Sequence, residues 1–318
     1  RCPICDGGSP SVVVEPGGSL RQSRYRPTMK EAAMLNYPLL FVERLTEHDL
    51  AVLTILDGSP SDVDELRALL HREPERIDDM LADPRLFELV FETPEDGMIA
   101  GLTPLLAFAV LVHRTMQDLG SASYVPEWVG AGERLPVFDV DTLRDFIEDV
   151  TRRYLLSEFL SSFTRVASGS VWIRTDRGYR RRRYNELDPL GLAEMVESLP
   201  AGTRAAGYRR LGEVALFHTG VFPDHTVRHP ISATRQVRLA RLAGIDPDEI
   251  VGVDYLQVLE KVGRLSYDRA ANEPSLPWQI HQPLQDMAAN FIPARRFLNY
   301  LADRYLHRME TGLMNPVA

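Results

Sequence analysis

The chain has 318 residues, which is enough for one large domain or two ordinary ones. Its content of 44% hydrophobic and 25% charged residues is close to the globular average and excludes wholesale disorder. A net charge of −9 disfavours tight nucleic-acid binding by the protein as a whole. The charge is uneven, however: residues 46–100 hold 15 acidic residues against 4 arginines, a net of −11, which leaves about +2 for the remainder.

The basic residues are almost all arginine. Lys30 and Lys261 are the two lysines, so 34 of the 36 basic residues are arginines. One interpretation is the codon usage of a GC-rich genome. The other is selection for planar, multidentate contacts to phosphate or carboxylate groups. Composition does not separate the two.

The chain is expected to be a soluble cytoplasmic protein. Its two cysteines, Cys2 and Cys5, cannot form a disulfide framework for the body of the protein, which is typical of a reducing compartment. The most apolar stretch, residues 98–112, is shorter than the roughly 20 residues that span a bilayer. No signal peptide is visible.

The first part of the chain is predicted to be an irregular arm followed by an acidic helical unit. Residues 1–45 form the arm, because glycine and proline bracket a short apolar run there. Residues 46–120 form the unit, whose first three short helices begin near Thr46, Ser61 and Glu73 in a helix-turn-helix outline. The third helix is acidic and a phosphate surface would repel it, so we interpret the unit as structural or protein-binding.

A buried helix is predicted from Thr103 to about residue 119, followed by a loop at 120–140 that serves as the best domain boundary. Residues 140–318 are then a helical domain. It is expected to begin with one long amphipathic helix at 141–166, capped by Asp141 or Thr142. Asp188 and Pro189 begin the next helix. Further helices are expected at about 203–219, 232–243, 247–270 and 285–310.

A β-hairpin with many arginines is predicted at about 170–184, with its turn at residues 175–178. Its basic residues are Arg174, Arg177, Arg180, Arg181, Arg182 and Arg183. Because side chains alternate across a strand, both faces of the second strand should be cationic. The hairpin then projects to contact a phosphate backbone, with Trp172, Tyr179 and Tyr184 available for stacking on bases. The alternative is a salt-bridged hairpin, with the acidic residues of 46–100 as its partner within the chain.

Two candidate metal sites come from histidines and cysteines. His218, His225 and His229 lie within twelve residues and suit zinc or iron, although their spacing matches no zinc signature. Prolines beside them predict a loop with solvated histidines instead. Cys2 and Cys5 are half of a zinc knuckle, which needs further ligands. An unpaired terminal tail is the alternative.

The sequence contains no recognised catalytic motif, because no GxGxxG, P-loop, GxSxG or HExxH pattern occurs. Residues 208–223, with Tyr208 to Phe217 and Gly220 to Pro223, resemble a recurring segment in uncharacterised bacterial proteins. Residues 254–267, with Asp254 to Leu256 and Leu265 to Tyr267, are similar to a later segment of the same proteins. The resemblance implies no activity.

These patterns predict a mainly α-helical multi-helix protein with one small β-hairpin and an irregular N-terminal arm. The leading functional hypothesis is a binding or regulatory protein whose arginine hairpin contacts a polyanion, such as nucleic acid, or an acidic protein surface. The alternatives are a metal-dependent enzyme that uses the three histidines and an oligomeric structural scaffold without activity.

Overall fold

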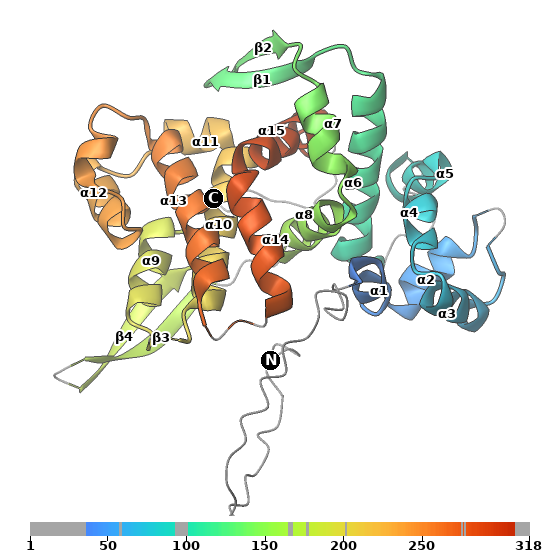
Figure 1. Ribbon diagram of the computed structural model, residues 1–318, viewed down its shortest axis with the longest axis horizontal. Helices are drawn as coiled ribbons and strands as arrows, with labels where there is room; N and C mark the ends of the chain where they lie inside the picture. Colours follow the sequence, from blue (N-terminus) through green and yellow to red (C-terminus); the bar gives the residue numbers. More distant parts are fainter. Residues whose placement is uncertain are drawn as a thin grey trace, which may run out of the picture. The chain divides into compact units, whose positions relative to one another are not determined.

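The computed structural model of the protein describes most of the chain between residues 36 and 308 (Figure 1). The described residues are 36–56, 59–92, 101–164, 168–175, 178–200, 202–274, 276 and 278–308, with side chains for all except 168–184 and 278. Cys2, Cys5 and most of the predicted N-terminal arm lie outside this part. The contacts group Leu35–Ala318 into one compact unit.

The described chain is mainly helical, which confirms the predicted fold class. Its first part consists of short helices: α1 (Tyr37–Val42), α2 (Glu47–Leu53), α3 (Val63–Arg72), α4 (Arg76–Leu81), α5 (Pro84–Phe87) and the π-helix η1 (Glu88–Glu92). Thr46 begins α2 as predicted. For α3 the cap is Asp62 rather than Ser61, because the Asp62 carboxylate accepts hydrogen bonds from two backbone N–H groups of the first turn.

The middle of the chain alternates helices with two hairpins. Its elements are α6 (Pro104–Ser121), β1 (Val125–Gly130), β2 (Glu133–Val137), α7 (Asp141–Glu148), α8 (Val150–Ser162), β3 (Ser168–Thr175) and β4 (Gly178–Asn185). Helix α6 is the predicted buried helix, and its residues from Leu105 to Val112 are all buried. The loop predicted at 120–140 is wrong: β1 and β2 form an antiparallel hairpin there.

The last part is an array of helices and one short 3₁₀ turn. Its elements are α9 (Pro189–Glu197), α10 (Ala205–Gly220), α11 (Pro223–Arg228), α12 (Ala233–Leu242), η2 (Pro247–Ile250), α13 (Tyr255–Asn272), α14 (Trp278–Ala289), α15 (Phe291–Leu301) and the π-helix η3 (Ala302–Leu306). Helices α10 and α12 confirm two predicted ranges. The ranges 247–270 and 285–310 are too long, since each contains a break, and α11 replaces a predicted loop.

Helix α10 lies at the centre of this array and contacts α9, α11, α13 and α15. Small residues let α10 and α13 approach closely. A Cβ atom added at Gly212 would lie 3.0 Å from the ring of Tyr267, and one at Gly263 would lie 3.0 Å from the Cβ atom of Ala215. The large apolar side chains of these helices are buried in one hydrophobic core that also includes α6 and α8.

The helix predicted at 141–166 is divided at Asp149, whose extended backbone ends α7. Its carboxylate then accepts a hydrogen bond from the backbone N–H of Arg152 and caps α8. Helix α6 of the predicted 46–120 unit packs against α7, α8 and α15 of the predicted 140–318 domain. The division of the chain into those two parts stays a prediction.

None of the described helices is long and apolar enough to cross a membrane.

Candidate functional site

The arginine-rich hairpin forms where the sequence predicts it. Strands β3 and β4 pair antiparallel over eight residue pairs, from Ser168 opposite Asn185 to Thr175 opposite Gly178. The four consecutive arginines, residues 180–183, therefore lie within the ladder, opposite residues 170–173. The side chains of Trp172, Arg174, Tyr179 and residues 180–184, and all of Arg177, lie outside the described part. The expectation of a two-sided cationic strand stays a prediction.

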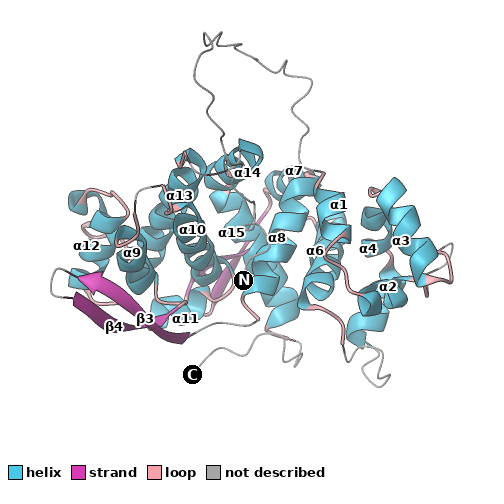
Figure 2. Ribbon diagram, turned by 90° about the horizontal axis from the view of Figure 1, so that it is seen from below, coloured by secondary structure: helices cyan, strands magenta, loops and turns pink. Residues whose placement is uncertain are grey.

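The hairpin and the acidic helices lie at opposite ends of the described unit. Figures 1 and 2 both show β3 and β4 at the end near α9 and α12, and α2 to α4 at the other end. The backbone contacts agree, because β4 meets α9, whereas α4 and α5 meet α6. The acidic residues of the described range 46–92 are thus not the hairpin's partner within one chain. The acidic residues of 93–100, which the interpretation also includes, lie outside the described part, so their pairing with the hairpin stays a prediction.

The base of the hairpin borders a cavity of about 340 Å³. Its wall includes the end of β4 and parts of α9, α10, α11, α12 and α13. The polar residues that line it include Asn185, Asp188, His218, His225, His229 and Arg235. A second cavity of about 350 Å³ shares Asp188 and Arg235 with the first. We call the two together the basal cleft. It brings the three clustered histidines together beside the arginine hairpin.

His218 is a structural residue in the wall of this cleft. Its Nε2 atom lies 2.8 Å from the carbonyl oxygen of Leu187, and its Nδ1 atom lies 3.3 Å from the hydroxyl of Thr226. Burial lowers the pKa of His218 and favours the neutral ring. The ring contacts hold α10 to the segment before α9 through Leu187 and to α11 through Thr226.

The described residues contain no group of three or more His, Cys, Asp or Glu side chains arranged to hold a metal ion. The three histidines therefore do not form the metal site proposed from their spacing. The physical reason is that both ring nitrogens of His218 face protein oxygen atoms. The zinc hypothesis for Cys2 and Cys5 lies outside the described residues.

His225 and His229 lie one turn apart on and just after α11, and both are exposed. Their ring centroids are 4.4 Å apart. The Nδ1 atom of His229 lies 3.0 Å from the carbonyl oxygen of His225 and donates to it. No hydrogen bond or ion pair with another described residue occupies the Nε2 atom of His229 or either nitrogen of His225.

Asp188 and Arg235 line both cavities. The Asp188 carboxylate caps α9 by accepting a hydrogen bond from the backbone N–H of Leu190, and it lies 3.4 Å from the Arg235 guanidinium. The Arg235 side chain is 50% exposed, so most of its N–H groups remain open to solvent. In the second cavity, Glu194 and Arg238 pair at 2.6 Å.

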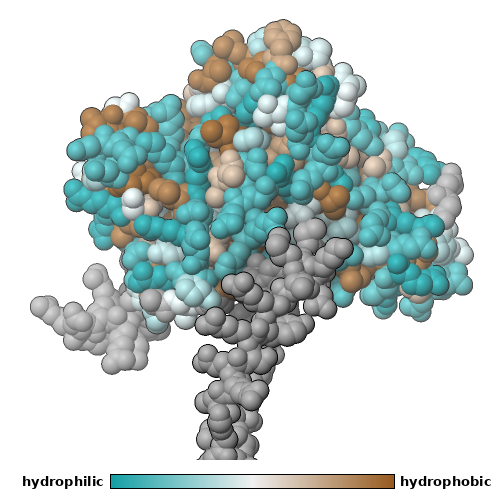
Figure 3. Space-filling view, viewed as in Figure 1, coloured by the Kyte–Doolittle hydropathy of each residue, from teal (hydrophilic) through white to brown (hydrophobic). Residues whose placement is uncertain are grey.

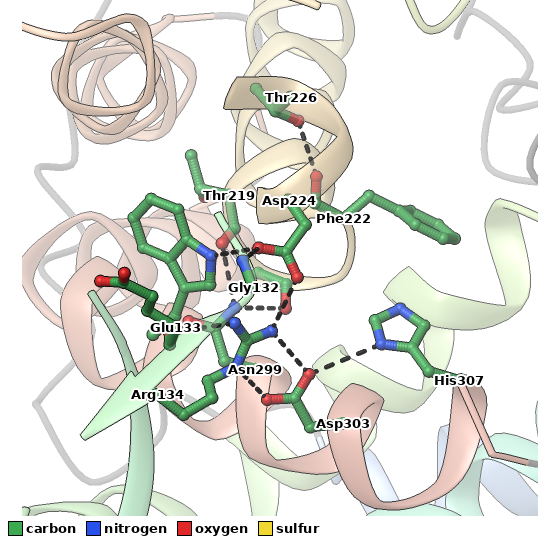
Figure 4. A network of polar contacts seen from close by, with 12 residues as sticks. Gly132, Glu133, Arg134, Thr219, Phe222, Asp224, Thr226, Asn299, Asp303 and His307 are labelled. Carbon is green, nitrogen blue, oxygen red and sulfur yellow. Dashed lines mark hydrogen bonds and ion pairs between the residues drawn. The ribbon is translucent and has the colours of Figure 1, made fainter. Parts of the chain in front are cut away.

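A polar network holds α11, and with it His225 and His229, against the β1–β2 hairpin (Figure 4). The Asp224 carboxylate accepts hydrogen bonds from the Trp128 indole N–H at 2.7 Å, the Gly132 backbone N–H at 2.9 Å and the Arg134 guanidinium at 3.0 Å. Burial raises the pKa of Asp224, but these hydrogen bonds outweigh it and lower the pKa below its ordinary value. The charged carboxylate is therefore a fixed anchor for α11.

Arg134 extends the network to the last of the described helices. Its guanidinium donates to the Asp303 carboxylate of η3, with one contact at 2.9 Å, and His307 lies 3.5 Å from the same carboxylate. Figure 4 shows Arg134 between Asp224 and Asp303. Sequence patterns do not reveal this network, because residues 90 and 169 positions away supply its two carboxylates.

Comparisons of this chain with protein-family models, with curated proteins and with solved structures gave no match. The resemblance of residues 208–223 and 254–267 to a bacterial family stays a prediction.

Proposed function

We propose that the protein is a cytoplasmic binding or regulatory protein whose β3–β4 hairpin contacts a polyanion, with nucleic acid as the most concrete ligand. The observation that supports this most is the position of the hairpin. Its strands lie at the end of the described unit opposite the acidic helices α2 to α4, away from the acidic residues of those helices (Figure 2).

Arginine is suited to this task, because its planar guanidinium donates two parallel hydrogen bonds to phosphate oxygens. Arg174, Arg177 and residues 180–183 supply the charge, and Trp172, Tyr179 and Tyr184 supply surfaces for base stacking. Stacking of this kind contributes about 1–3 kcal/mol per base. The basal cleft adds Arg235, His225 and His229 next to the strand end. A ligand that follows β4 thus meets basic side chains beyond the hairpin.

The proposal is tested by titrating fluorescein-labelled single-stranded and duplex oligonucleotides with the protein at low salt. We expect saturable binding that is lost when residues 180–183 are replaced by glutamine. Unchanged binding by this variant, or no binding at low salt by the parent protein, would overturn the proposal. Far-ultraviolet circular dichroism checks that the variant retains its helices.

A second candidate is an oligomeric scaffold, and the same separation of charge favours it. A basic hairpin and acidic helices that cannot meet within one copy can meet between copies, which gives a head-to-tail assembly. Sedimentation velocity in low and high salt distinguishes the candidates. Salt-sensitive association of the protein alone, abolished by glutamine at residues 180–183, supports the scaffold. A monomer at all concentrations and salt levels contradicts it.

A further inference from the structure

We infer that Arg210 of α10 is a positioning residue for polyanion binding, because it fixes the base of the β3–β4 hairpin and thus the direction of its strands. This inference rests on the proposed function and adds a residue in the body of the protein on which binding depends. Three features carry it: the position of Arg210 between the two chain segments that flank the hairpin, its low exposure, and the contacts of its guanidinium.

Arg210 lies where the chain runs toward the hairpin. Its Nη1 atom donates to the hydroxyl of Ser162, the last residue of α8, at 2.8 Å. The guanidinium also covers the ring of Phe163, with its central carbon 4.0 Å from the ring centroid. The face of an aromatic ring attracts a cation at this distance. Strand β3 begins shortly afterwards, at Ser168, so Arg210 holds the segment that leads into it.

The same side chain lies where the chain leaves the hairpin. Glu186 directly follows Asn185, the last residue of β4, and its carboxylate lies 2.9 Å from the Nε atom of Arg210. The Arg210 and Glu186 side chains are 16% and 25% exposed, so salt screens this pair less than a pair on the surface. Glu213 of α10 accepts from Nη1 of Arg210 at 3.0 Å. One guanidinium therefore connects α8, α10 and the end of β4.

The aromatic partner of Arg210 is itself fixed in the core. Phe163 stacks on Phe217 of α10, with ring centroids 4.1 Å apart and an angle of 9° between the ring planes. Both rings are buried. Displacement of Arg210 from Phe163 would therefore disturb a contact of the central helix. A base that is fixed before binding reduces the conformational entropy that the hairpin loses when a ligand binds.

The hairpin depends on its base for its direction. A two-stranded sheet is at best marginally stable on its own. In Figure 1 the two strands extend past α9, which β4 contacts. Contacts at the base then decide how often the strands keep the direction that a ligand requires. Loss of Arg210 should lower the population of the binding-competent arrangement without removing a group that contacts the ligand.

The test compares Arg210→Gln with the matched control Arg209→Gln. Arg209 precedes Arg210 on α10 and pairs with the same Glu213, at 2.7 Å, but its other ion pair is with Glu158 within α8. Each substitution removes one positive charge. Fluorescence anisotropy with a labelled oligonucleotide gives the affinity at several salt concentrations.

If the competent arrangement falls to about one tenth, Arg210→Gln should bind about tenfold more weakly than the parent protein. The slope of log affinity against log salt concentration should stay unchanged, because no phosphate contact is lost. Arg209→Gln should bind like the parent protein. Arg210→Lys should weaken binding less than Arg210→Gln, since lysine keeps the charge for Glu186 but not the planar group over Phe163.

Digestion with trypsin gives a second measurement that needs no ligand. Trypsin cleaves after arginine, and cleavage at residues 174–183 requires local opening of the hairpin. Mass spectrometry of the fragments gives the rate at these positions. We expect faster cleavage there in Arg210→Gln than in the parent protein or in Arg209→Gln, with Arg210→Lys in between.

The outcomes separate this inference from the proposed function. Equal affinity of Arg210→Gln and the parent protein, or equal cleavage within 174–183, overturns the inference and leaves the hairpin proposal standing. Equal losses of affinity in Arg210→Gln and Arg209→Gln also overturn it, because general damage to α10 would then explain both. Absence of binding by the parent protein overturns the proposed function and, with it, the role of Arg210 in binding.

Discussion

Arg134 shows how one side chain can connect three distant segments. It pairs with Asp224 and Asp303, and its side chain is only 20% exposed. Replacing it with glutamine leaves two carboxylates without their cation. Removing one partner of a buried ion pair lowers the free energy of unfolding by roughly 3–5 kcal/mol, and the effect is smaller in this half-buried pair. We expect Arg134→Gln to lower the free energy of unfolding by about 2–3 kcal/mol, measured by urea titration.

The matched control for Arg134 is Arg67, which pairs at 3.7 Å with an exposed aspartate, Asp64, three residues earlier on α3. Exposed pairs of this kind contribute about 0–1 kcal/mol. Arg67→Gln should therefore change the free energy of unfolding by less than about 1 kcal/mol. Equal effects of the two substitutions would contradict the structural role assigned to Arg134.

Asp303 makes part of the stability depend on pH. Burial raises its pKa, but hydrogen bonds from His307 and Arg134 outweigh burial and lower the pKa of Asp303 to about 2. An aspartate in the unfolded chain has a pKa near 3.9. The stabilisation is therefore complete above about pH 4 and is lost as the pH falls toward about 2, with a size on the order of 2 kcal/mol. Asp303→Asn should reduce the slope of unfolding free energy against pH in this interval; an unchanged slope would contradict this assignment.

At the scale of elements, Asp49 joins the N-termini of two helices. Its fully buried carboxylate accepts from the backbone N–H and hydroxyl of Thr46 before α2, and from the same two groups of Thr103 before α6. Asp49→Ala leaves four partly buried donors at the two helix N-termini without their charged acceptor, and a hydrogen bond to a charged group contributes about 1.5–3 kcal/mol. We expect the free energy of unfolding, measured by thermal or urea denaturation, to fall by roughly 2–4 kcal/mol. The control Asp64→Ala, at a largely exposed position, should change the free energy of unfolding little.

Elements with strong local signals could be predicted from the sequence, and those fixed by tertiary contacts could not. Helix α6 is predictable because its apolar run begins at Thr103 and Pro104, and the β3–β4 hairpin because its turn and alternation are local. The β1–β2 hairpin is not, because Pro126 and Pro136 normally oppose strand formation. The two prolines lie directly opposite each other, in a two-stranded hairpin where each strand has a free edge.

The candidate site could be predicted in part. Sequence alone singles out the arginines and the three histidines, because each set is clustered in the chain. It does not place Asp188 and Arg235 beside the histidines, since α9, α11 and α12 meet only in the folded protein. It also predicts a loop for residues 223–228, where Pro223 instead occupies the first turn of α11, a position that needs no N–H donor.

At the scale of the whole described unit, a buried network connects the acidic helices to the rest. Asp78 of α4 accepts from His113 of α6 at 2.9 Å and from Arg153 of α8 at 3.1 Å, and both partners are buried. Burial raises the pKa of Asp78, but these partners outweigh burial and lower it. Because the network crosses the domain boundary proposed from the sequence, we expect a single cooperative unfolding transition by scanning calorimetry. Two resolved transitions would show that the parts unfold separately.

The exposed surface is not uniformly polar. Figure 3 shows hydrophobic side chains gathered over β1 and β2, where Tyr124, Val129, Leu135 and Phe138 are all more than 45% exposed. This region is distant in the chain from the hairpin at 168–185. It lies on the β1–β2 hairpin, which Arg134 attaches to α11. Its apolar surface differs from the basic surface proposed for β3 and β4.

The most direct test of polyanion binding is the salt dependence of oligonucleotide affinity. The parent protein is compared with a hairpin variant, glutamine at residues 180–183, and with a control that replaces Arg67, Arg72, Arg76 and Arg85 at the acidic end. Both variants lose four positive charges. Each lost phosphate contact lowers the magnitude of the slope of log affinity against log salt concentration by roughly 0.7–0.9. We therefore predict that this magnitude falls by about 3 in the hairpin variant and by less than about 1 in the control. Equal changes in the two variants would show that net charge, rather than the hairpin, governs binding.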